Sequence, residues 1–216
     1  MSDIAAGTNP APAVHGIAPA GDLSDGARLA KREEQAAVRN LPGRRAKGLL
    51  IVYTGKGKGK TTAALGLVMR AWGRGMRVGV FQFIKARTGN WGERRAATKM
   101  GVDMVGLGDG FTWMSKDIAH DRALASEGWS RCREAIEHGG YDLIVLDELT
   151  YCLKFGWLDT VEVLRVIARR PPALHVVVTG RDAPEALLEA ADLVSEIIDV
   201  KHPYRAGIRA QKGIEF

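Results

Sequence analysis

The residues best suited to chemistry lie in a short glycine- and lysine-rich stretch, residues 54–62, which reads TGKGKGKTT. It follows an apolar run and opens a helix-forming run, which is the context that a phosphate-binding P-loop requires. Its glycines let successive backbone amides approach an anion, and the positive end of the following helix adds to that attraction. The pattern predicts nucleotide binding by Thr54, Gly55, Lys56, Gly57, Lys58, Gly59, Lys60, Thr61 and Thr62.

The spacing within this stretch assigns separate tasks to its residues. Lys60 is placed to reach the outer phosphates of a nucleotide, and the Thr61 hydroxyl to ligate Mg²⁺. The common pattern begins with glycine, but Thr54 stands at that position here. Lys56 and Lys58 are additional cations, which suit either a highly charged leaving group or a solvated surface. A surface loop without a ligand is the alternative interpretation, and the strand–loop–helix context argues against it.

Two neighbouring carboxylates, Asp147 and Glu148, end a second apolar run, residues 141–146. At the carboxyl end of a strand beside the P-loop strand, either carboxylate would reach the Mg²⁺ of a bound nucleotide. Successive strand residues point to opposite faces, so we expect different roles for the two unless the strand has already ended. An ordinary acidic strand end is the alternative.

From residue 47 onward, strand-like and helix-like segments alternate. Strands are expected at 48–53, 77–84, 102–107, 141–146, 174–178 and 193–200, and helices at 61–74, 92–100, 116–138, 160–169 and 182–190. This alternation predicts an α/β fold: a single RecA-like P-loop NTPase domain with a mainly parallel sheet and helices on both faces. Ligands of such sheets bind beyond the carboxyl ends of the strands.

The N-terminal part of the chain differs in composition. Residues 1–21 are rich in alanine, glycine and proline, and we expect them to be disordered and not to act as a secretory signal. Residues 22–44 are expected to form a basic helical arm, helical over 22–40, which serves either as a lid or as a solvated segment. Residues 45–216 then form the catalytic domain.

Charge, hydropathy and cysteine content limit the possible environments of the chain. The net charge of +6 suits an anionic ligand but does not distinguish a nucleotide from a nucleic acid. No apolar run approaches the roughly 20 residues needed to span a bilayer, so we expect no membrane association. Cys132 and Cys152 lack a partner pattern, which predicts reduced thiols in or near the core of a cytoplasmic protein.

Beyond the P-loop, several stretches resemble the P-loop family of ATP:corrinoid adenosyltransferases. The most distinctive are GFTW at 110–113 and the C-terminal run KHPYRAGIRAQKGIEF at 201–216; the others are residues 54–66, DLIVLDEL at 142–149 and VVTGRDAP at 177–184. Their order and spacing are those of the family, and the resemblance covers about residues 45–216. Within the family, the sequence is most similar to members that act on cob(I)yrinic acid a,c-diamide in the aerobic pathway.

The resemblance implies a reaction in adenosylcobalamin biosynthesis. A Co(I) corrinoid, cob(I)yrinic acid a,c-diamide or cob(I)alamin, attacks the 5′ carbon of ATP, and triphosphate leaves. ATP and the corrinoid are then substrates, and Mg²⁺ is the cofactor, with Mn²⁺ able to substitute. Lys60 and the metal would meet the charge that develops on the triphosphate. The catalytic set would be Lys60, Thr61 and Glu148, and the metal ligands Thr61 and Glu148, with Asp147 as a second ligand or a support.

The resemblance also implies contacts beyond the phosphates. Arg70 would contact the nucleotide, and Phe111 and Trp113 would face the corrinoid. A bulky apolar wall excludes an axial ligand of Co(II) and so eases its reduction to Co(I). The N-terminal arm would cover the corrinoid site, in a homodimer from the partner subunit, and a flavoprotein reductase would supply electrons.

Two other functions use the same loop. A RecA-like ATPase would bind single-stranded nucleic acid through the basic arm and use Glu148 to activate water. A small-molecule kinase would need an arginine-rich lid, for which residues 87–95 are a candidate. The products distinguish the three: triphosphate from the transferase, orthophosphate from the ATPase and ADP from the kinase.

Overall fold

The computed structural model describes residues 25–39, 46–89, 91–110 and 117–215. The chain divides into two units, residues 1–45 and 46–216. The first contains helix α1, Asp25–Arg39, which lies within the range 22–40 expected to be helical. Within the described ranges, no helix is both long enough and apolar enough to cross a bilayer.

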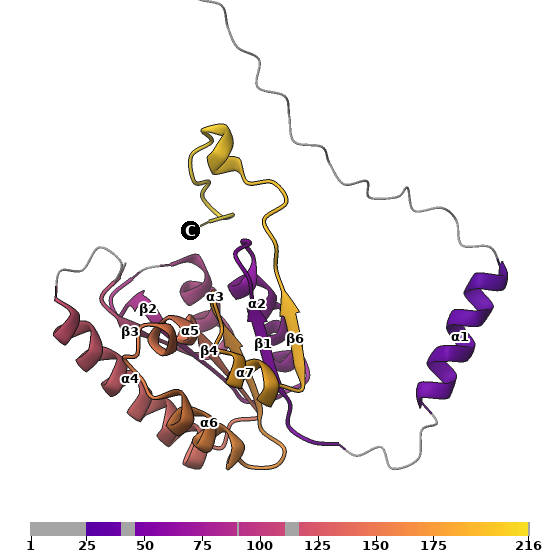
Figure 1. Ribbon diagram of the computed structural model, residues 1–216, viewed down its shortest axis with the longest axis horizontal. Helices are drawn as coiled ribbons and strands as arrows, with labels where there is room; N and C mark the ends of the chain where they lie inside the picture. The colour runs from indigo at the N-terminus through magenta and orange to yellow at the C-terminus, as the bar shows by residue number, and fades with distance from the viewer. Residues whose placement is uncertain (1–24, 40–45, 90, 111–116, 216) are drawn as a thin grey trace, which may run out of the picture. The chain divides into compact units, whose positions relative to one another are not determined.

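The second unit is an α/β domain built on a six-stranded parallel sheet (Figure 1). The strand order is β3-β2-β4-β5-β1-β6, and every paired neighbour runs parallel. The strands are β1 Leu50–Thr54, β2 Val78–Ala86, β3 Asp103–Gly108, β4 Leu143–Asp147, β5 His175–Thr179 and β6 Leu193–Glu196. The predicted fold class is confirmed.

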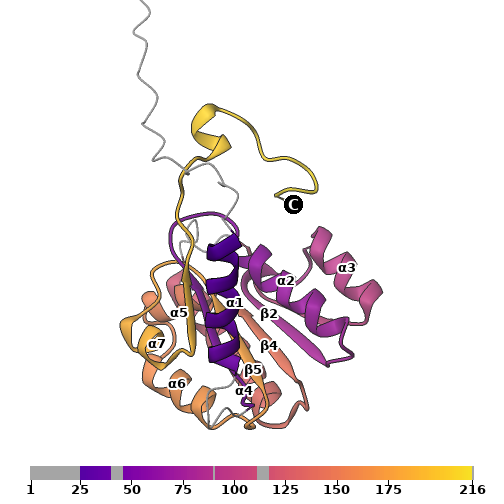
Figure 2. The same cartoon turned by 90° about the vertical axis from the view of Figure 1, so that its right-hand side faces the viewer.

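Helices cover both faces of this sheet (Figure 2). Helices α2 (Lys60–Trp72) and α3 (Gly92–Met100) pack on one face. The other face carries α4 Ile118–His138, α5 Leu149–Lys154, α6 Thr160–Ala168 and α7 Glu185–Ala190. A short 3₁₀ helix, η2 (Pro203–Ala206), follows β6.

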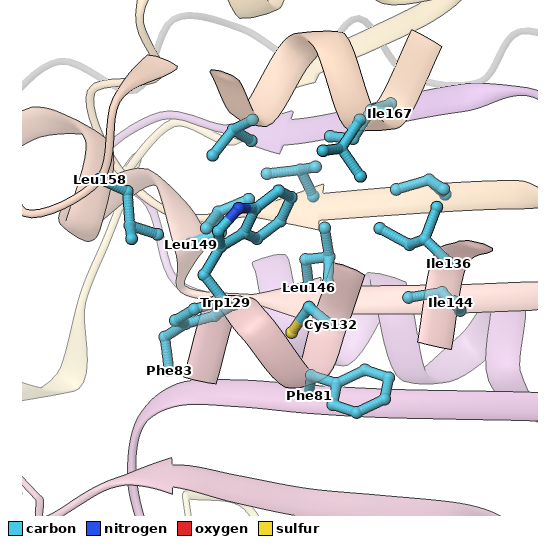
Figure 3. Close-up of a cluster of buried hydrophobic side chains, with 14 of the residues drawn as sticks. Phe81, Phe83, Trp129, Cys132, Ile136, Ile144, Leu146, Leu149, Leu158 and Ile167 are labelled. Atoms are coloured by element: carbon cyan, nitrogen blue, oxygen red, sulfur yellow. The ribbon is translucent and has the colours of Figure 1, made fainter. Parts of the chain in front are cut away.

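Successive side chains along each strand point to opposite faces of the sheet, and both faces are covered by helices. On β4, Ile144 and Leu146 belong to the cluster under α4–α7, whereas Leu143 and Val145 belong to the cluster under α2 and α3. A strand whose two faces are both covered must be apolar throughout, which is why it reads as a continuous hydrophobic run. The larger cluster gathers around Trp129 of α4, with residues from strands and helices on all sides (Figure 3).

Both cysteines lie in this larger cluster. Cys132 and Cys152 are buried and free, as predicted. Burial raises the pKa of the Cys132 thiol well above its usual range and that of Cys152 to about 12. The two thiols therefore stay protonated and act as small apolar side chains.

One prediction about the sheet is wrong. The strand that ends at Asp147 does not lie beside the P-loop strand, because β1 pairs with β5 and β6. Strand β5 separates β1 from β4 and pairs with both. Order along the chain does not reveal such an insertion, because any of the other four parallel strands, which are similar in composition, could occupy the intervening position.

One helix was missed, and the end of one strand lies well before its expected position. Helix α5 begins directly after the carboxylate pair and was not predicted, because six residues are too few to show a helical period. Strand β6 ends at Glu196 and not at residue 200. Strand β1 ends at Thr54, whose carbonyl accepts a bond from the Ile197 amide, and the Ile197 carbonyl then accepts a bond from the Gly57 amide of the P-loop.

Candidate active site

The P-loop lies at the carboxyl edge of the sheet, between the end of β1 and the start of α2. Gly55 and Gly59 have φ values of 95° and 119°, which side chains rarely adopt. Gly57 approaches another segment closely, because a Cβ there would lie 2.6 Å from the backbone of Ile198. The loop glycines thus serve a close approach to the chain after β6 as well as a turn.

Lys60 is held inside this loop. The residue is 6% exposed, and its Nζ donates to the carbonyl oxygens of Gly55 at 3.0 Å and Gly57 at 2.7 Å. Burial lowers the pKa of Lys60, and the nearby Glu148 carboxylate opposes that change. The ammonium group is therefore bonded to backbone oxygens of the same loop in which it would bind phosphates.

The loop's departure from the common pattern has a structural role. Thr54, in the position of the first glycine, is the last residue of β1 and is buried. Its Oγ1 accepts a hydrogen bond from the backbone amide of Ala183 at 3.3 Å. The threonine thereby connects the P-loop to the segment that follows β5.

Asp147 is the centre of a buried hydrogen-bond network. Its Oδ1 accepts bonds from the hydroxyls of Thr61 at 2.8 Å and Thr179 at 2.7 Å. Its Oδ2 accepts a bond from the Gln82 side-chain amide at 3.0 Å. The carboxylate has no exposed surface. Three strands and the start of α2 therefore meet at one aspartate, and its bond to Thr61 places it beside the proposed metal-binding hydroxyl.

Glu148 has different surroundings, because the strand ends before it. It has a φ of 63°, in the left-handed region, and lies just ahead of α5. Its backbone amide donates to the Thr179 hydroxyl at 3.0 Å. Its Oε2 is buried and has no hydrogen-bond partner among the described residues. Burial, and then the neighbouring charge of Asp147, raises the pKa of Glu148 to about 7.

The structure adds functional candidates that the sequence reasoning did not place in the transferase site. Thr179 and Gln82 are buried polar side chains that fix the orientation of Asp147. Arg181 follows β5 and lies close enough to Lys60 and Glu148 to affect the pKa of each. Its carbonyl accepts a bond from the Thr150 hydroxyl at 2.8 Å. The signal for two of them was present in the stretch VVTGRDAP, which contains Thr179 and Arg181.

The remaining residues predicted to contact the nucleotide are exposed. Lys56 and Thr62 are exposed at the loop. Lys58 is also exposed but paired, its Nζ lying 3.1 Å from Glu215 Oε2. Arg70 is an exposed residue in the last turn of α2, about 15 Å along the helix axis from Lys60. The structure does not bring Arg70 to the phosphate loop.

Phe111 and Trp113 lie outside the described residues. The described residues on either side of them are connected, because Asp109 Oδ2 lies 2.8 Å from His120 Nε2. Asp109 follows β3, and His120 is in the first turn of α4.

The cluster at the carboxyl edge is suited to a polyanion and a hard cation. Lysines line the loop, and hydroxyl and carboxylate oxygens, which Mg²⁺ prefers, lie beside them. Within the described ranges, no group of three or more histidines, cysteines or acidic residues forms a site that would hold a metal by itself.

Comparison with known proteins extends this description. The family model described as ATP:corrinoid adenosyltransferase BtuR/CobO/CobP matches residues 46–216. A Corrinoid adenosyltransferase from Sinorhizobium sp is 44% identical over 79% of this chain and 81% of its own length. A Corrinoid adenosyltransferase from Escherichia coli K12 is 39% identical over 88% of this chain and 96% of its own.

Among solved structures, the crystal structure of flagellar accessory protein FlaH from Methanocaldococcus jannaschii is similar over 74% of this chain and 76% of that chain. Its TM-score is 0.48 and its sequence identity 11%.

Proposed function

The chain belongs to the ATP:corrinoid adenosyltransferase family, and from this premise we propose that it transfers the 5′-deoxyadenosyl group of ATP to the Co(I) of a corrinoid in adenosylcobalamin biosynthesis. Cob(I)yrinic acid a,c-diamide is the proposed acceptor, with cob(I)alamin as a second one. The observation that carries the proposal is that the family match, residues 46–216, contains the whole carboxyl-edge cluster around Lys60 and Asp147.

The bond changes of this reaction define what the site must supply. The electron pair of Co(I) forms the bond to C5′ of ATP, and the C5′–O bond breaks with its pair going to the triphosphate oxygen. No proton has to be removed from a nucleophile, so no general base is needed. The main requirement is to stabilise negative charge on the leaving group with donors that are already in place.

Lys60 supports this role because its ammonium group is already oriented inside the loop. Its bonds to the carbonyls of Gly55 and Gly57 hold it within reach of an anion in the loop. Lys56 and Lys58 add charge at the rim. Arg181 is a further cation close to Lys60. Arg70, at the far end of α2, is proposed only as a contact for the nucleoside end of ATP.

Mg²⁺ fits the residues beside the loop. The buried Oε2 of Glu148, to which no described residue bonds, and the hydroxyl of Thr61 are oxygen ligands of the kind that Mg²⁺ takes. We propose Thr61 and Glu148 as its ligands, with Asp147 orienting Thr61; Mn²⁺ would fit the same oxygens. A bound Mg²⁺ would neutralise part of the triphosphate charge. It would also lower the pKa of the Glu148 carboxyl, which burial raises in its absence.

The corrinoid contacts are proposed from the family resemblance alone. Phe111 and Trp113 would form the apolar wall that displaces an axial ligand of Co(II). A polar replacement of either should impair turnover that starts from Co(II) much more than turnover that starts from chemically prepared Co(I). Equal losses from both starting states would contradict a specific role in reduction. The matched control is Trp72→Gln, an exposed tryptophan on α2.

The remaining partners are proposals of the same kind. The protein would act in the cytoplasm as a homodimer, receive electrons from a flavoprotein reductase and bind neither nucleic acid nor membrane. The basic arm, residues 22–44, would cover the corrinoid site.

The decisive experiment is anaerobic incubation with ATP, Mg²⁺ and chemically reduced corrinoid. We expect equimolar triphosphate and adenosylated corrinoid, and almost no orthophosphate when corrinoid is left out. Glu148→Gln should cut the transfer, and a higher Mg²⁺ concentration should partly restore it. Steady release of orthophosphate without corrinoid, lost in Glu148→Gln, would instead assign the site to an ATPase that activates water. ADP formation would assign it to a kinase.

A further inference from the structure

The C-terminal segment, residues 197–215, begins and ends on the P-loop. It leaves the sheet after β6 at the carboxyl edge and turns back beyond η2 (Figure 1). At its start, the Ile197 carbonyl accepts a bond from the Gly57 amide at 2.7 Å, and the Ile197 amide donates to the Thr54 carbonyl at 2.9 Å. The loop apex is therefore packed against the root of this segment.

The end of the segment returns to the same loop through a charged side chain. Glu215 Oε2 lies 3.1 Å from Lys58 Nζ, with side-chain exposures of 19% and 46%. A local turn holds the glutamate, because its amide donates to the Gln211 carbonyl at 2.9 Å. The backbone of Glu215 is thus held in a turn, and its side chain extends from that turn to Lys58.

These contacts change what the loop offers to an anion. The Gly57 amide is committed to Ile197 and is not available to a ligand, so the rim lysines carry more of the attraction at the loop apex. Lys58, one of these, is already paired with a carboxylate. An exposed ion pair is weak, so a multiply charged polyphosphate can compete for the lysine. The displaced glutamate would then lie beside a ligand of the same sign.

We propose that Glu215 is a positioning residue that competes with triphosphate for Lys58 and so speeds release of the product. The proposal rests on the proposed function in taking triphosphate as that product. Adenosyl transfer leaves this polyanion among several lysines, where it would otherwise be retained. An internal carboxylate that re-forms the ion pair lowers the affinity for the product without touching the reacting atoms.

The test is direct calorimetric binding of inorganic tripolyphosphate with Mg²⁺, which needs no turnover. Glu215→Gln should bind it about fivefold more tightly than the wild type, the size of effect expected from one exposed ion pair. Glu215→Asp keeps the charge and should stay near the wild-type affinity. Glu189→Gln, an exposed glutamate on α7, is the control for net charge. Weaker or unchanged binding in Glu215→Gln would overturn the proposal, since a purely structural role of Glu215 predicts one of these results.

Two further measurements make the result specific. In a Lys58→Gln background, Glu215→Gln should no longer alter tripolyphosphate affinity; a fivefold gain that persists would overturn the competition for Lys58. In wild-type turnover, tripolyphosphate should inhibit less strongly than in Glu215→Gln, by the same factor. Absence of all adenosyl transfer would contradict the proposed function but leave the binding test intact. Normal transfer with unchanged tripolyphosphate affinity would contradict the role of Glu215 alone.

Discussion

The Thr61 hydroxyl donates a hydrogen bond of 2.8 Å to Asp147 Oδ1, although the two residues lie 86 positions apart. The first belongs to the helix after the P-loop, and the second ends β4, which is not a neighbour of β1. The gap is bridged by β5, whose Thr179 donates to the same Oδ1 at 2.7 Å. One buried carboxylate therefore aligns the P-loop helix with two strands.

Removing the Lys60 ammonium should abolish turnover. Lys60→Ala deletes the cation tied to the Gly55 and Gly57 carbonyls and should lower kcat/KM by roughly 100-fold or more. Steady-state kinetics with ATP and reduced corrinoid measure this. Lys99→Ala removes an exposed lysine at the end of α3 and should have no effect. Near-normal kcat/KM in Lys60→Ala would contradict the P-loop assignment.

Asp147 should matter for stability as well as for the site. Asp147→Asn keeps one acceptor oxygen, but its NH₂ would face the Gln82 amide unless that amide turns over. We expect a loss of about 1–3 kcal/mol in the free energy of unfolding, measured with denaturant.

Thr179 provides a matched pair of variants for the same network. Thr179→Ser keeps the hydroxyl that donates to Asp147 and should remain close to wild type, whereas Thr179→Val should lose stability and require more Mg²⁺. Identical behaviour of the serine and valine variants would show that the hydroxyl does not orient the carboxylate.

The raised pKa of Glu148 predicts a specific pH dependence of stability without metal. The pKa is about 7 in the folded chain and about 4.3 in an unfolded one. Between these two pH values the folded state keeps a proton on Glu148 that the unfolded state has released. The stabilising contribution of this proton is fully present below about pH 4 and is lost as the pH rises through about 7. Glu148→Gln stays neutral, so with EDTA it should be more stable than the wild type at pH 8, by about 1–3 kcal/mol.

The same difference should vanish near pH 3, below both pKa values, where the wild-type carboxyl is protonated in the folded and the unfolded state. Denaturant unfolding at the two pH values measures it. Glu134→Gln, an exposed glutamate on α4, should show no such pH-dependent difference. Parallel stability curves for Glu148→Gln and the wild type between pH 3 and 8 would mean that the carboxylate is better solvated than its burial indicates.

The N-terminal region should separate into a dispensable and a functional part. Deletion of residues 1–21 should leave activity unchanged, because their composition offers little to bury. Deletion of residues 1–40 removes α1 and should leave a folded domain that binds ATP but turns over corrinoid poorly. Full activity of the protein that lacks residues 1–40 would show that the arm is a solvated segment and not a lid. Binding of the full chain to single-stranded DNA at physiological salt, lost in that deletion, would favour a nucleic-acid function.

The sequence by itself determined the fold class, the phosphate loop and the family. Each depends on local order: alternating periodicity for the parallel sheet, strand–loop–helix context for residues 54–62, and motif spacing for the resemblance. It also indicated that Asp147 and Glu148 would differ. The sequence could not show how the roles of the two carboxylates differ, because this depends on whether the strand continues past Asp147. The left-handed backbone of Glu148 ends the strand.

Only the tertiary structure decided which residues meet at the site. It placed β5 between β1 and β4, which brings Thr179 to Asp147, and it folded the C-terminal segment back so that Glu215 pairs with Lys58 across 157 positions. The physical reason is that long-range packing sets both the strand order and the path of the C-terminal segment. The apolar segments that pack together are similar in composition, so the sequence carries no periodic signal of which ones become neighbours.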